Sequence, residues 1–320
     1  MGSKTTIRAP HLRDGTRVAL VAPAGPLLEL DDLRRAEELC RALGWEPVLG
    51  AHAGAHHGYL AGTDDQRLKD LNDALTDESV GAIWCIRGGY GLTRILAGVN
   101  FDAARRLPKV ILGFSDVTAL LLALHRQTGL ITFHGPVARH ELTGFTRSHL
   151  ERVLTMAEPA GQLAPPTPPP GILVPSEHRV TSLTGGVAEG PLIGGNLTLV
   201  QCLLGTPYLP SLDGAILFLE DVGEAHYRVD RMLSHLRLAG ALDRVAGVAL
   251  GRFTEMERRG SDGATGLDRI FADYFVPLGI PVVMGLPFGH VREQWTLPVG
   301  SRARLDADAG TLALLEAAVS

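Results

Sequence analysis

The sequence predicts an α/β fold in which a parallel, doubly wound sheet is followed by a second, smaller α/β domain. In the first half, short apolar runs that look like buried strands alternate with segments of helical periodicity. Several of these runs end in glycine-containing loops, and parallel sheets gather such loops at the carboxyl ends of their strands. A proline-rich stretch then separates this half from a part with a different rhythm. Together these observations predict two α/β domains.

The first half alternates between predicted strands and predicted helices. The strands are apolar and partly β-branched, and they occupy residues 17–22, 46–49, 82–86, 110–112 and 131–133. The helices occupy residues 31–43, 63–75, 92–97 and 119–124. The first helix stops at Gly44, and the second opens on Thr63 followed by two aspartates, which are common helix-end signals. This order predicts a parallel sheet whose loops gather at one edge.

The second half follows a stretch that can be neither helix nor central strand. Residues 157–171 contain six prolines, so we expect residues 157–185 to form a linker between domains at 1–156 and 186–320. Beyond the linker, residues 191–200 are predicted to run from a loop into a helix. The remaining predicted elements are strands at 215–219, 245–250 and 280–284, helices at 227–238 and 267–275, and short β segments between 295 and 315.

Composition narrows the classes of function. The 320 residues are 45% apolar and 20% charged with a net charge of −5, which is typical of a soluble protein and provides no basic surface for nucleic acid. No apolar run approaches the ~18 residues of a membrane helix, and the N-terminus lacks the apolar core of a signal peptide. The three cysteines, Cys40, Cys85 and Cys202, are far apart in predicted helices or strands, which indicates buried free thiols in a reducing compartment. We therefore expect a cytoplasmic protein without nucleic-acid or membrane partners.

Ser115 lies at the turn from the fourth predicted strand into the following helix. This strand–turn–helix setting, with the sequence Gly-Phe-Ser-Asp-Val at 113–117, is that of a nucleophile elbow. The backbone N–H of Asp116 would then lie at a helix N-terminus, where a developing oxyanion is stabilised. Val117 stands where the usual elbow has a second glycine. A serine that only caps the helix is the alternative interpretation.

A nucleophilic serine needs a base, and the base needs an acid that orients it. Among the twelve histidines, His134 and His290 each follow a strand and lie in a glycine-containing loop, where α/β folds place their chemistry. Glu220 directly ends an apolar strand, whereas Asp221 would point to the opposite face. The chain order Ser115, Glu220, His290 is one that α/β serine hydrolases use.

A metal site is not expected. His52, His56 and His57 could ligate a metal by type, but they lie in a loop of small residues that favours solvated histidines. Hydrolysis by an activated serine also needs no cofactor.

Eight short motifs follow one another along the chain in the order of a known peptidase family. They are YLAGTD at 59–64, RGGYG at 87–91, GFSDVT at 113–118, HGP at 134–136, GGN at 194–196, LEDV at 219–222, YRVDR at 227–231 and GH at 289–290. In these motifs the chain resembles the LD-carboxypeptidase family of serine peptidases, which includes murein tetrapeptide carboxypeptidases and microcin-C self-immunity peptidases. The proline-rich stretch departs from the pattern of that family.

The resemblance implies an N-terminal flavodoxin-like domain, a smaller α/β C-terminal domain and a site between them. By position, Ser115 resembles the nucleophile, Glu220 the acid and His290 the base, while His134 resembles a structural loop residue. The resemblance also implies a homodimer that acts on a small peptide. The enzyme would cleave the bond between an L-centre and a C-terminal D-amino acid, releasing D-alanine from murein tetrapeptides during cell-wall recycling.

The remaining site residues are expected to hold the oxyanion and the substrate. The oxyanion would lie between the N–H of Asp116 and one from the turn at Gly88 and Gly89. A carboxypeptidase must also recognise a free carboxylate, which calls for an arginine fork or a backbone nest. The candidates for substrate contacts are Arg87, Tyr90, Arg228 and Arg231.

Two alternatives stay open. Within the family, the substrate could be a peptidyl nucleotide of the microcin-C type, although residues 157–206 contain no Trp, Tyr or Phe on which a nucleobase could stack. From another class, the chain could be a non-catalytic protein that binds a phosphate-type ligand at residues 88–91, although this stretch lacks the G-x-G-x-x-G pattern. Labelling of Ser115 by a fluorophosphonate would distinguish an enzyme from a binding protein.

Overall fold

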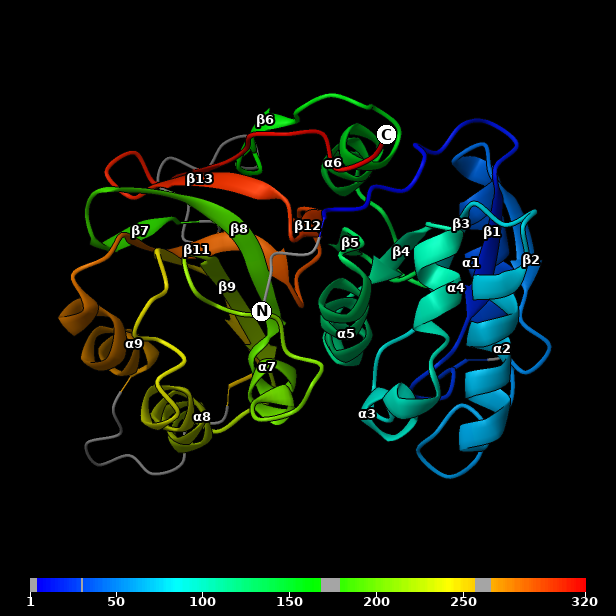
Figure 1. Cartoon of the computed structure of the whole chain (residues 1–320), viewed down its shortest axis with the longest axis horizontal. Helices are drawn as coiled ribbons and strands as arrows, with labels where there is room; N and C mark the ends of the chain where they lie inside the picture. The colour runs from blue at the N-terminus through cyan, green and yellow to red at the C-terminus, as the bar shows by residue number, and fades with distance from the viewer. Residues whose placement is uncertain (1–4, 30, 168–178, 257–265) are drawn as a thin grey trace.

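The computed structural model describes residues 5–29, 31–167, 179–256 and 266–320, and within these ranges the chain forms two β-sheets. Figure 1 shows the sheet of the first half on the right and the sheet of the second half on the left, with helices around and between them. The structure thus has the mixed α/β architecture that the sequence predicts.

The first sheet has the strand order of a flavodoxin-like fold. Its described strands are β1 (Arg17–Val21), β2 (Glu46–Leu49), β3 (Ala82–Cys85), β4 (Val110–Gly113), β5 (Thr132–His134) and β12 (Leu297–Val299). They lie in the order β12-β5-β4-β3-β1-β2. Read from the β2 edge, β1 to β5 follow the flavodoxin order 2-1-3-4-5. β1 to β5 pair in parallel, and β12 pairs antiparallel with β5 at the edge. The prediction of an N-terminal, flavodoxin-like parallel sheet is confirmed.

Helices cover both faces of this sheet. As a result, every residue of the central strands β3 and β4 is buried. The helices of this half are α1 (Asp32–Ala42), α2 (Asp64–Thr76), α3 (Leu92–Ile95), α4 (Phe101–Arg106), α5 (Thr118–Thr128) and α6 (Gly144–Leu154), with 3-10 turns η1 (Leu96–Gly98) and η2 (Ser115–Val117). α2 opens with a capping box between Thr63 and Gln66. α4 and α6 were not predicted, although Asn100 and Thr143 cap them as such residues commonly do.

The second sheet has a parallel centre with antiparallel margins. Its described strands are β6 (Gly161–Gln162), β7 (Thr181–Thr184), β8 (Val187–Asn196), β9 (Ile216–Val222), β10 (Gly247–Thr254), β11 (Val282–Gly289), β13 (Arg302–Asp306) and β14 (Thr311–Leu314). They lie in the order β6-β14-β13-β8-β9-β10-β11-β7, and β8 to β11 run parallel. The carboxyl ends of these four strands meet at one edge, where parallel sheets bind ligands.

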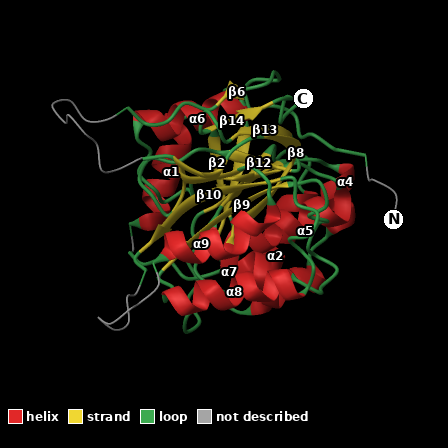
Figure 2. Cartoon of the chain, turned by 90° about the vertical axis from the view of Figure 1, so that its left-hand side faces the viewer, coloured by secondary structure: helices red, strands yellow, loops and turns green. Residues whose placement is uncertain are grey.

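Helices of the second half cover one face of this sheet, as Figure 2 shows. They are α7 (Leu197–Leu203), α8 (His226–Leu238) and α9 (Leu267–Phe275), with the 3-10 turn η3 (Val276–Leu278). α8 buries Val229, Met232, Leu233 and Leu236, the face that its periodicity predicts.

β8 begins earlier than the sequence suggests. The prediction of a loop at 191–196 is wrong, because these residues form the second half of β8. A Cβ at Gly194 would lie 1.8 Å from the backbone carbonyl oxygen of Phe218 on the neighbouring strand β9. The glycines that suggested a loop are therefore required for the close approach of two strands.

The segment at 157–185 includes paired strands. β6 pairs with β14 and β7 pairs with β11, so both ends of this segment join the second sheet. Of the six prolines at 157–171, the three at 168–170 lie outside the described residues. In addition, β12 comes from the second half of the chain but pairs with β5 of the first sheet. A strand from the second half of the chain therefore belongs to the first sheet, which the predicted domain boundaries do not include.

α5 packs between the two sheets (Figure 1). Its residues from Thr118 to Leu124 are fully buried, as expected of a helix that is apolar on most sides. It contacts β4 and β5 of the first sheet as well as β8 and α7 of the second half. The turn η2, which precedes α5, also contacts β8, so this turn lies where the two halves meet.

Candidate active site

Ser115 lies at the tip of the sharp turn between β4 and α5. Its φ is +65°, which is uncommon for a residue with a side chain and characteristic of a nucleophile elbow. Gly113 makes room for the turn, because a Cβ there would lie 2.9 Å from the side chain of Val117. The elbow thus uses a small residue before the serine and packs Val117 where the usual elbow has glycine.

The loop after β3 presses directly against Ser115. A Cβ at Gly88 would lie 2.7 Å from the Cβ of Ser115 and 3.0 Å from its Oγ. The next residue, Gly89, has a φ of +104° and lies against Gly25, whose N–H donates to the Gly88 carbonyl at 2.9 Å. Only glycine allows the backbone to come this close to the serine.

A chain of hydrogen bonds links Ser115 to Glu220 through His290. The distance from Ser115 Oγ to His290 Nε2 is 3.1 Å, and the distance from His290 Nδ1 to Glu220 Oε2 is 2.7 Å. Because an ionised carboxylate only accepts hydrogen bonds, we assign the ring proton to Nδ1, which leaves Nε2 to accept from the serine hydroxyl. The structure therefore brings together three side chains from the ends of β4, β9 and β11.

Packing holds the acid and the histidine in one orientation. The side chain of Glu220 is 0% exposed, and Gly289 makes room for it, since a Cβ at 289 would lie 2.7 Å from Glu220 Oε2. Among the described residues, Glu220 Oε1 has no hydrogen-bond partner. The ring of Phe114 packs 4.8 Å from the ring of His290, between centroids. His290 therefore has little freedom to turn away from the serine.

Asp221, the next residue on β9, ties the two halves together. It accepts hydrogen bonds from Asn196 Nδ2 at 2.9 Å and from the Thr198 N–H at 3.0 Å. The Asn196 N–H donates in turn to Thr118 Oγ1, at the start of α5, at 3.1 Å. Burial and the nearby charge of Glu220 raise the pKa of Asp221. This network fixes the end of β9 relative to the start of α5.

The carboxylate of Asp116 anchors the loop that follows β3. Its Oδ2 accepts the backbone N–H of Leu92, at the start of α3, at 2.8 Å. Burial raises the pKa of Asp116 to about 6, although this hydrogen bond acts in the opposite direction. Asp116 therefore ties the turn of Ser115 to the loop that contains Gly88.

Protonation of Asp116 makes stability depend on pH in a definite direction. In the folded protein the pKa of this carboxyl is about 6, against an ordinary value of 3.8, which we take for the unfolded chain. The stability that this group contributes therefore falls as pH rises from about 4 to about 6. Compared with Asp116→Asn, the unmodified protein should lose about 1 kcal/mol more between pH 5 and pH 7. Urea unfolding of both proteins at the two pH values measures this difference, and parallel pH curves would contradict it.

Two further histidines lie near the site, His134 buried and His140 half-buried. His134 lies among the rings of Phe114, Phe218 and Phe288, and burial lowers its pKa to about 3. In the described part of the chain, neither of its ring nitrogens has a hydrogen-bond partner. Burial also lowers the pKa of His140 to about 4. A neutral ring in an aromatic cluster fits the structural role that the resemblance implies for His134.

The histidines considered as metal ligands do not gather around a common point. His52 contacts Asp70 instead, with 2.7 Å between Nδ1 and Oδ1. Within the described ranges, no three His, Cys, Asp or Glu side chains are grouped so that they could hold a metal ion. The same ranges contain no helix whose length and apolar character would let it cross a membrane.

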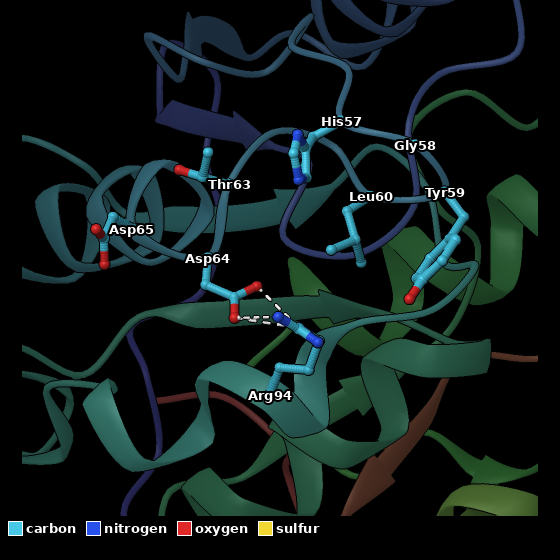
Figure 3. A pocket seen from close by; sticks show the side chains of 8 residues that line it. All are labelled: His57, Gly58, Tyr59, Leu60, Thr63, Asp64, Asp65 and Arg94. Carbon is cyan, nitrogen blue, oxygen red and sulfur yellow. Dashed lines mark hydrogen bonds and ion pairs between the residues drawn. The ribbon is translucent and has the colours of Figure 1, made fainter.

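Tyr90 adjoins a pocket of about 460 Å³ that is shown in Figure 3. Tyr59 lines this pocket, and its ring packs edge-on against that of Tyr90 with 5.6 Å between centroids. Asp64 and Arg94 line the same pocket and form an ion pair at 2.8 Å (Figure 3). The motifs at 59–64 and 87–91 therefore lie side by side.

The other candidates for substrate contacts lie at different distances from the chemistry. Arg87 directly precedes Gly88 and donates a hydrogen bond to the Pro26 carbonyl. Arg231 is exposed on α8, where its guanidinium carbon lies 5.4 Å from the centre of the Tyr227 ring. On the same helix, Arg228 is exposed and pairs at 3.6 Å with a glutamate one turn earlier.

Arg139 and His140 lie near the site but were not predicted to do so. The ring of His140 lies 5.4 Å from that of Phe114, between centroids, and Phe114 precedes the serine. The N–H of Arg139 donates to the carbonyl of Ile86 at 3.3 Å. Their position just after the HGP motif at 134–136 was the signal that could have found them.

This site defines a class of protein. A serine at a sharp strand-to-helix turn, hydrogen-bonded through a histidine to a buried carboxylate, is the arrangement of α/β serine hydrolases. Residues 18–135 match the model of the LD-carboxypeptidase N-terminal domain, and residues 189–305 match that of the LD-carboxypeptidase C-terminal domain. The chain belongs to the LD-carboxypeptidase family, which confirms the resemblance seen in its motifs.

Similar proteins match over nearly the whole chain. A putative carboxypeptidase of Synechocystis sp. is 41% identical over 312 residues, which are 98% of each chain. The murein tetrapeptide carboxypeptidase of Pseudomonas aeruginosa is 37% identical over 298 residues, 91% of this chain and 94% of its own. Among solved structures, the microcin C7 self-immunity protein MccF in its apo state has a TM-score of 0.89 at 26% identity, covering 98% of this chain and 100% of that one.

Proposed function

We propose that the chain is a serine carboxypeptidase that cleaves the amide bond between an L-centre and a C-terminal D-amino acid, and that it releases D-alanine from murein tetrapeptides in cell-wall recycling. The observation that carries the proposal is the hydrogen-bonded chain from Ser115 through His290 to Glu220, with distances of 3.1 and 2.7 Å. The name of the Pseudomonas aeruginosa relative supports the choice of substrate.

In this proposal, Ser115 is the nucleophile, His290 the base and Glu220 the orienting acid. His290 Nε2 takes the hydroxyl proton of Ser115 as its oxygen attacks the scissile carbonyl carbon. Glu220 holds the ring in the required tautomer and stabilises the imidazolium that forms. His290 then gives the proton to the departing amine, leaving an acyl-enzyme. Water that His290 deprotonates hydrolyses this ester and restores the serine.

The backbone N–H groups of Asp116 and Gly89 hold the oxyanion. Asp116 is the second residue of the 3-10 turn η2, directly after Ser115, and Gly89 belongs to the loop that presses on the serine through Gly88. Both groups are parts of the backbone, so they are already in place when the negative charge develops. Removing one such donor typically costs about 100-fold in turnover.

The same proposal places the enzyme in the cytoplasm as a homodimer that needs no cofactor. Cys40, Cys85 and Cys202 are all free thiols, which supports a reducing compartment, but the prediction that all three are buried is wrong because Cys202 is exposed. The homodimer follows from the family resemblance. Light scattering after size-exclusion chromatography should give about twice the 34.1 kDa of one chain, and a mass of one chain would contradict a stable dimer.

Incubation with defined peptides tests the reaction. Tetrapeptides with L-lysine or meso-diaminopimelate at the third position should both be tried, with D-alanine release followed by mass spectrometry. We expect release from at least one of them and none from a matched peptide that ends in L-alanine. A purified protein that labels with a fluorophosphonate but releases D-alanine from neither peptide would contradict the proposed substrate.

The structural likeness to MccF favours one alternative substrate, an amino acid linked to a nucleotide. MccF has been solved with aspartyl sulfamoyl adenosine, and that structure has a TM-score of 0.86 to this chain. Comparing kcat/KM for that compound and for the tetrapeptides decides between the two. A clear preference for the nucleotide would replace the murein peptide as substrate and leave the roles of the triad unchanged.

A further inference from the structure

Two arginines lie next to each other at the carboxyl edge of the first sheet. Arg87 follows β3, and Arg139 lies in the loop that follows β5. This loop crosses the end of β4 and bonds to the end of β3, because the N–H of Ala138 donates to the Cys85 carbonyl at 3.0 Å and that of Arg139 to the Ile86 carbonyl at 3.3 Å. β1 and β3 flank the switch point of a flavodoxin-like sheet, where ligands bind.

In the described part of the chain, neither guanidinium has an ion-pair partner. Nε of Arg139 is buried there without a hydrogen bond, and Arg87 donates to the uncharged Pro26 carbonyl. The charge of Asp32 raises the pKa of Arg87, but the two side chains form no ion pair: Asp32 Oδ2 accepts the Leu28 N–H and its Oδ1 makes no hydrogen bond in the described part of the chain. Burial and the Arg139 charge lower the pKa of Arg87. Two like charges held together in this way need an anion to offset them.

The arginines flank the turn that carries Ser115. Gly88, which follows the first arginine, contacts Ser115, and a Cβ there would lie 2.7 Å from the serine Cβ. His140, which follows the second, packs its ring 5.4 Å from that of Phe114, between centroids. In a peptide cleaved at its last bond, the free carboxylate is only one residue beyond the attacked carbonyl carbon. Its binding group must therefore lie beside the nucleophile.

Two other arginines, Arg94 on α3 and Arg228 on α8, already have carboxylate partners. Arg94 forms an ion pair with Asp64 at 2.8 Å, and Arg228 pairs with Glu224 at 3.6 Å. An arginine that already has a carboxylate gains less from a second one, because its charge is already offset.

We propose that Arg87 and Arg139 together bind the terminal carboxylate of the substrate. This inference rests on the proposed function and deepens it, since it assigns the group that makes the enzyme cut at the end of a peptide. Each planar guanidinium can present two parallel N–H donors to a carboxylate. A peptide without a free carboxylate would leave both charges unpaired in the crevice, so the enzyme would discriminate against internal bonds.

The test compares a tetrapeptide that ends in D-alanine with the same peptide ending in D-alanine amide. The unmodified protein should cleave the acid with a kcat/KM about 100-fold above that for the amide. Arg87→Gln and Arg139→Gln should each lower kcat/KM for the acid by about 30-fold and change the value for the amide by less than about threefold. Arg139→Lys keeps the charge without the fork and should fall between. Arg244→Gln, which removes an exposed arginine paired with Asp213, should leave the ratio unchanged.

Labelling of Ser115 by a fluorophosphonate at an unchanged rate shows that a variant is folded, and a lysine variant at the same position replaces any glutamine variant that is not. A collapsed acid-to-amide ratio in the arginine variants supports the inference. An unchanged ratio in all of them, with D-alanine still released from the acid, overturns the inference and leaves the proposed function standing. If the unmodified protein cleaves the last bond of neither peptide, the proposed function fails and the inference fails with it.

Discussion

Replacing Ser115 with alanine should lower kcat for the tetrapeptide about a millionfold. The substitution removes only the hydroxyl group, whose oxygen lies 3.1 Å from His290 Nε2. Without it no acyl-enzyme can form, and the remaining rate comes from substrate binding and the oxyanion donors alone. Release of D-alanine measured over days at high enzyme concentration gives the residual rate.

The alanine variant should keep its fold. Alanine carries a Cβ like serine, so the positive φ at 115 costs both proteins the same, and thermal unfolding should change little. A fluorophosphonate should no longer label the protein, which controls for contamination by unmodified enzyme. A variant of Ser115 that keeps more than about 1% of the turnover would show that another group is the nucleophile.

Replacing Glu220 with glutamine should lower kcat about ten-thousandfold. Glu220 is fully buried and accepts from His290 Nδ1 at 2.7 Å, so it fixes the proton on that nitrogen. A glutamine can present its NH₂ group there instead, which would favour the opposite tautomer and turn Nε2 from an acceptor into a donor. It also lacks the negative charge that stabilises the imidazolium. Single-turnover kinetics with the tetrapeptide would show a slow acylation step.

Asp221→Asn is the matched control for this prediction. Asp221 is the adjacent buried carboxylate, but it bonds to Asn196 and Thr198 and not to His290. Its replacement should lower the free energy of unfolding by about 1–3 kcal/mol, because buried donors lose acceptors, while kcat stays within about tenfold. Equal losses of kcat in both variants would mean that Glu220 acts through the fold and not through the histidine.

The regular parts of the fold could be predicted from the sequence because their signals are local. The apolar runs that became β1, β3, β4 and β9 are each buried, so hydrophobicity alone reveals them. The second half of β8 could not be predicted in this way, since its glycines pack against another strand and a single sequence does not show which strand that is. The short helix α4 is only six residues long and offers too few turns for a periodic pattern.

Some residues of the candidate site could likewise be predicted from local signals, and others could not. Ser115, Glu220 and His290 lie near or just past the carboxyl ends of β4, β9 and β11, so their positions could be predicted even though their contact could not be. Arg139 became visible only in the structure, because its neighbour in space is Arg87, from a different strand, and two like charges give no pairing signal in a sequence. The position of β12 was missed for a related reason. A short apolar strand fits either sheet, and only the path of the chain decides between them.

The path of the chain after His290 limits how the molecule can move. β11 ends in the second sheet at Gly289, and β12, which starts at Leu297, is already hydrogen-bonded to β5 of the first sheet. A hinge motion that separates the halves would break the hydrogen bonds between β12 and β5 and would move His290 away from Ser115. We therefore expect peptides to enter and leave through small movements of the loops around the site, while the two sheets keep their relative position throughout turnover.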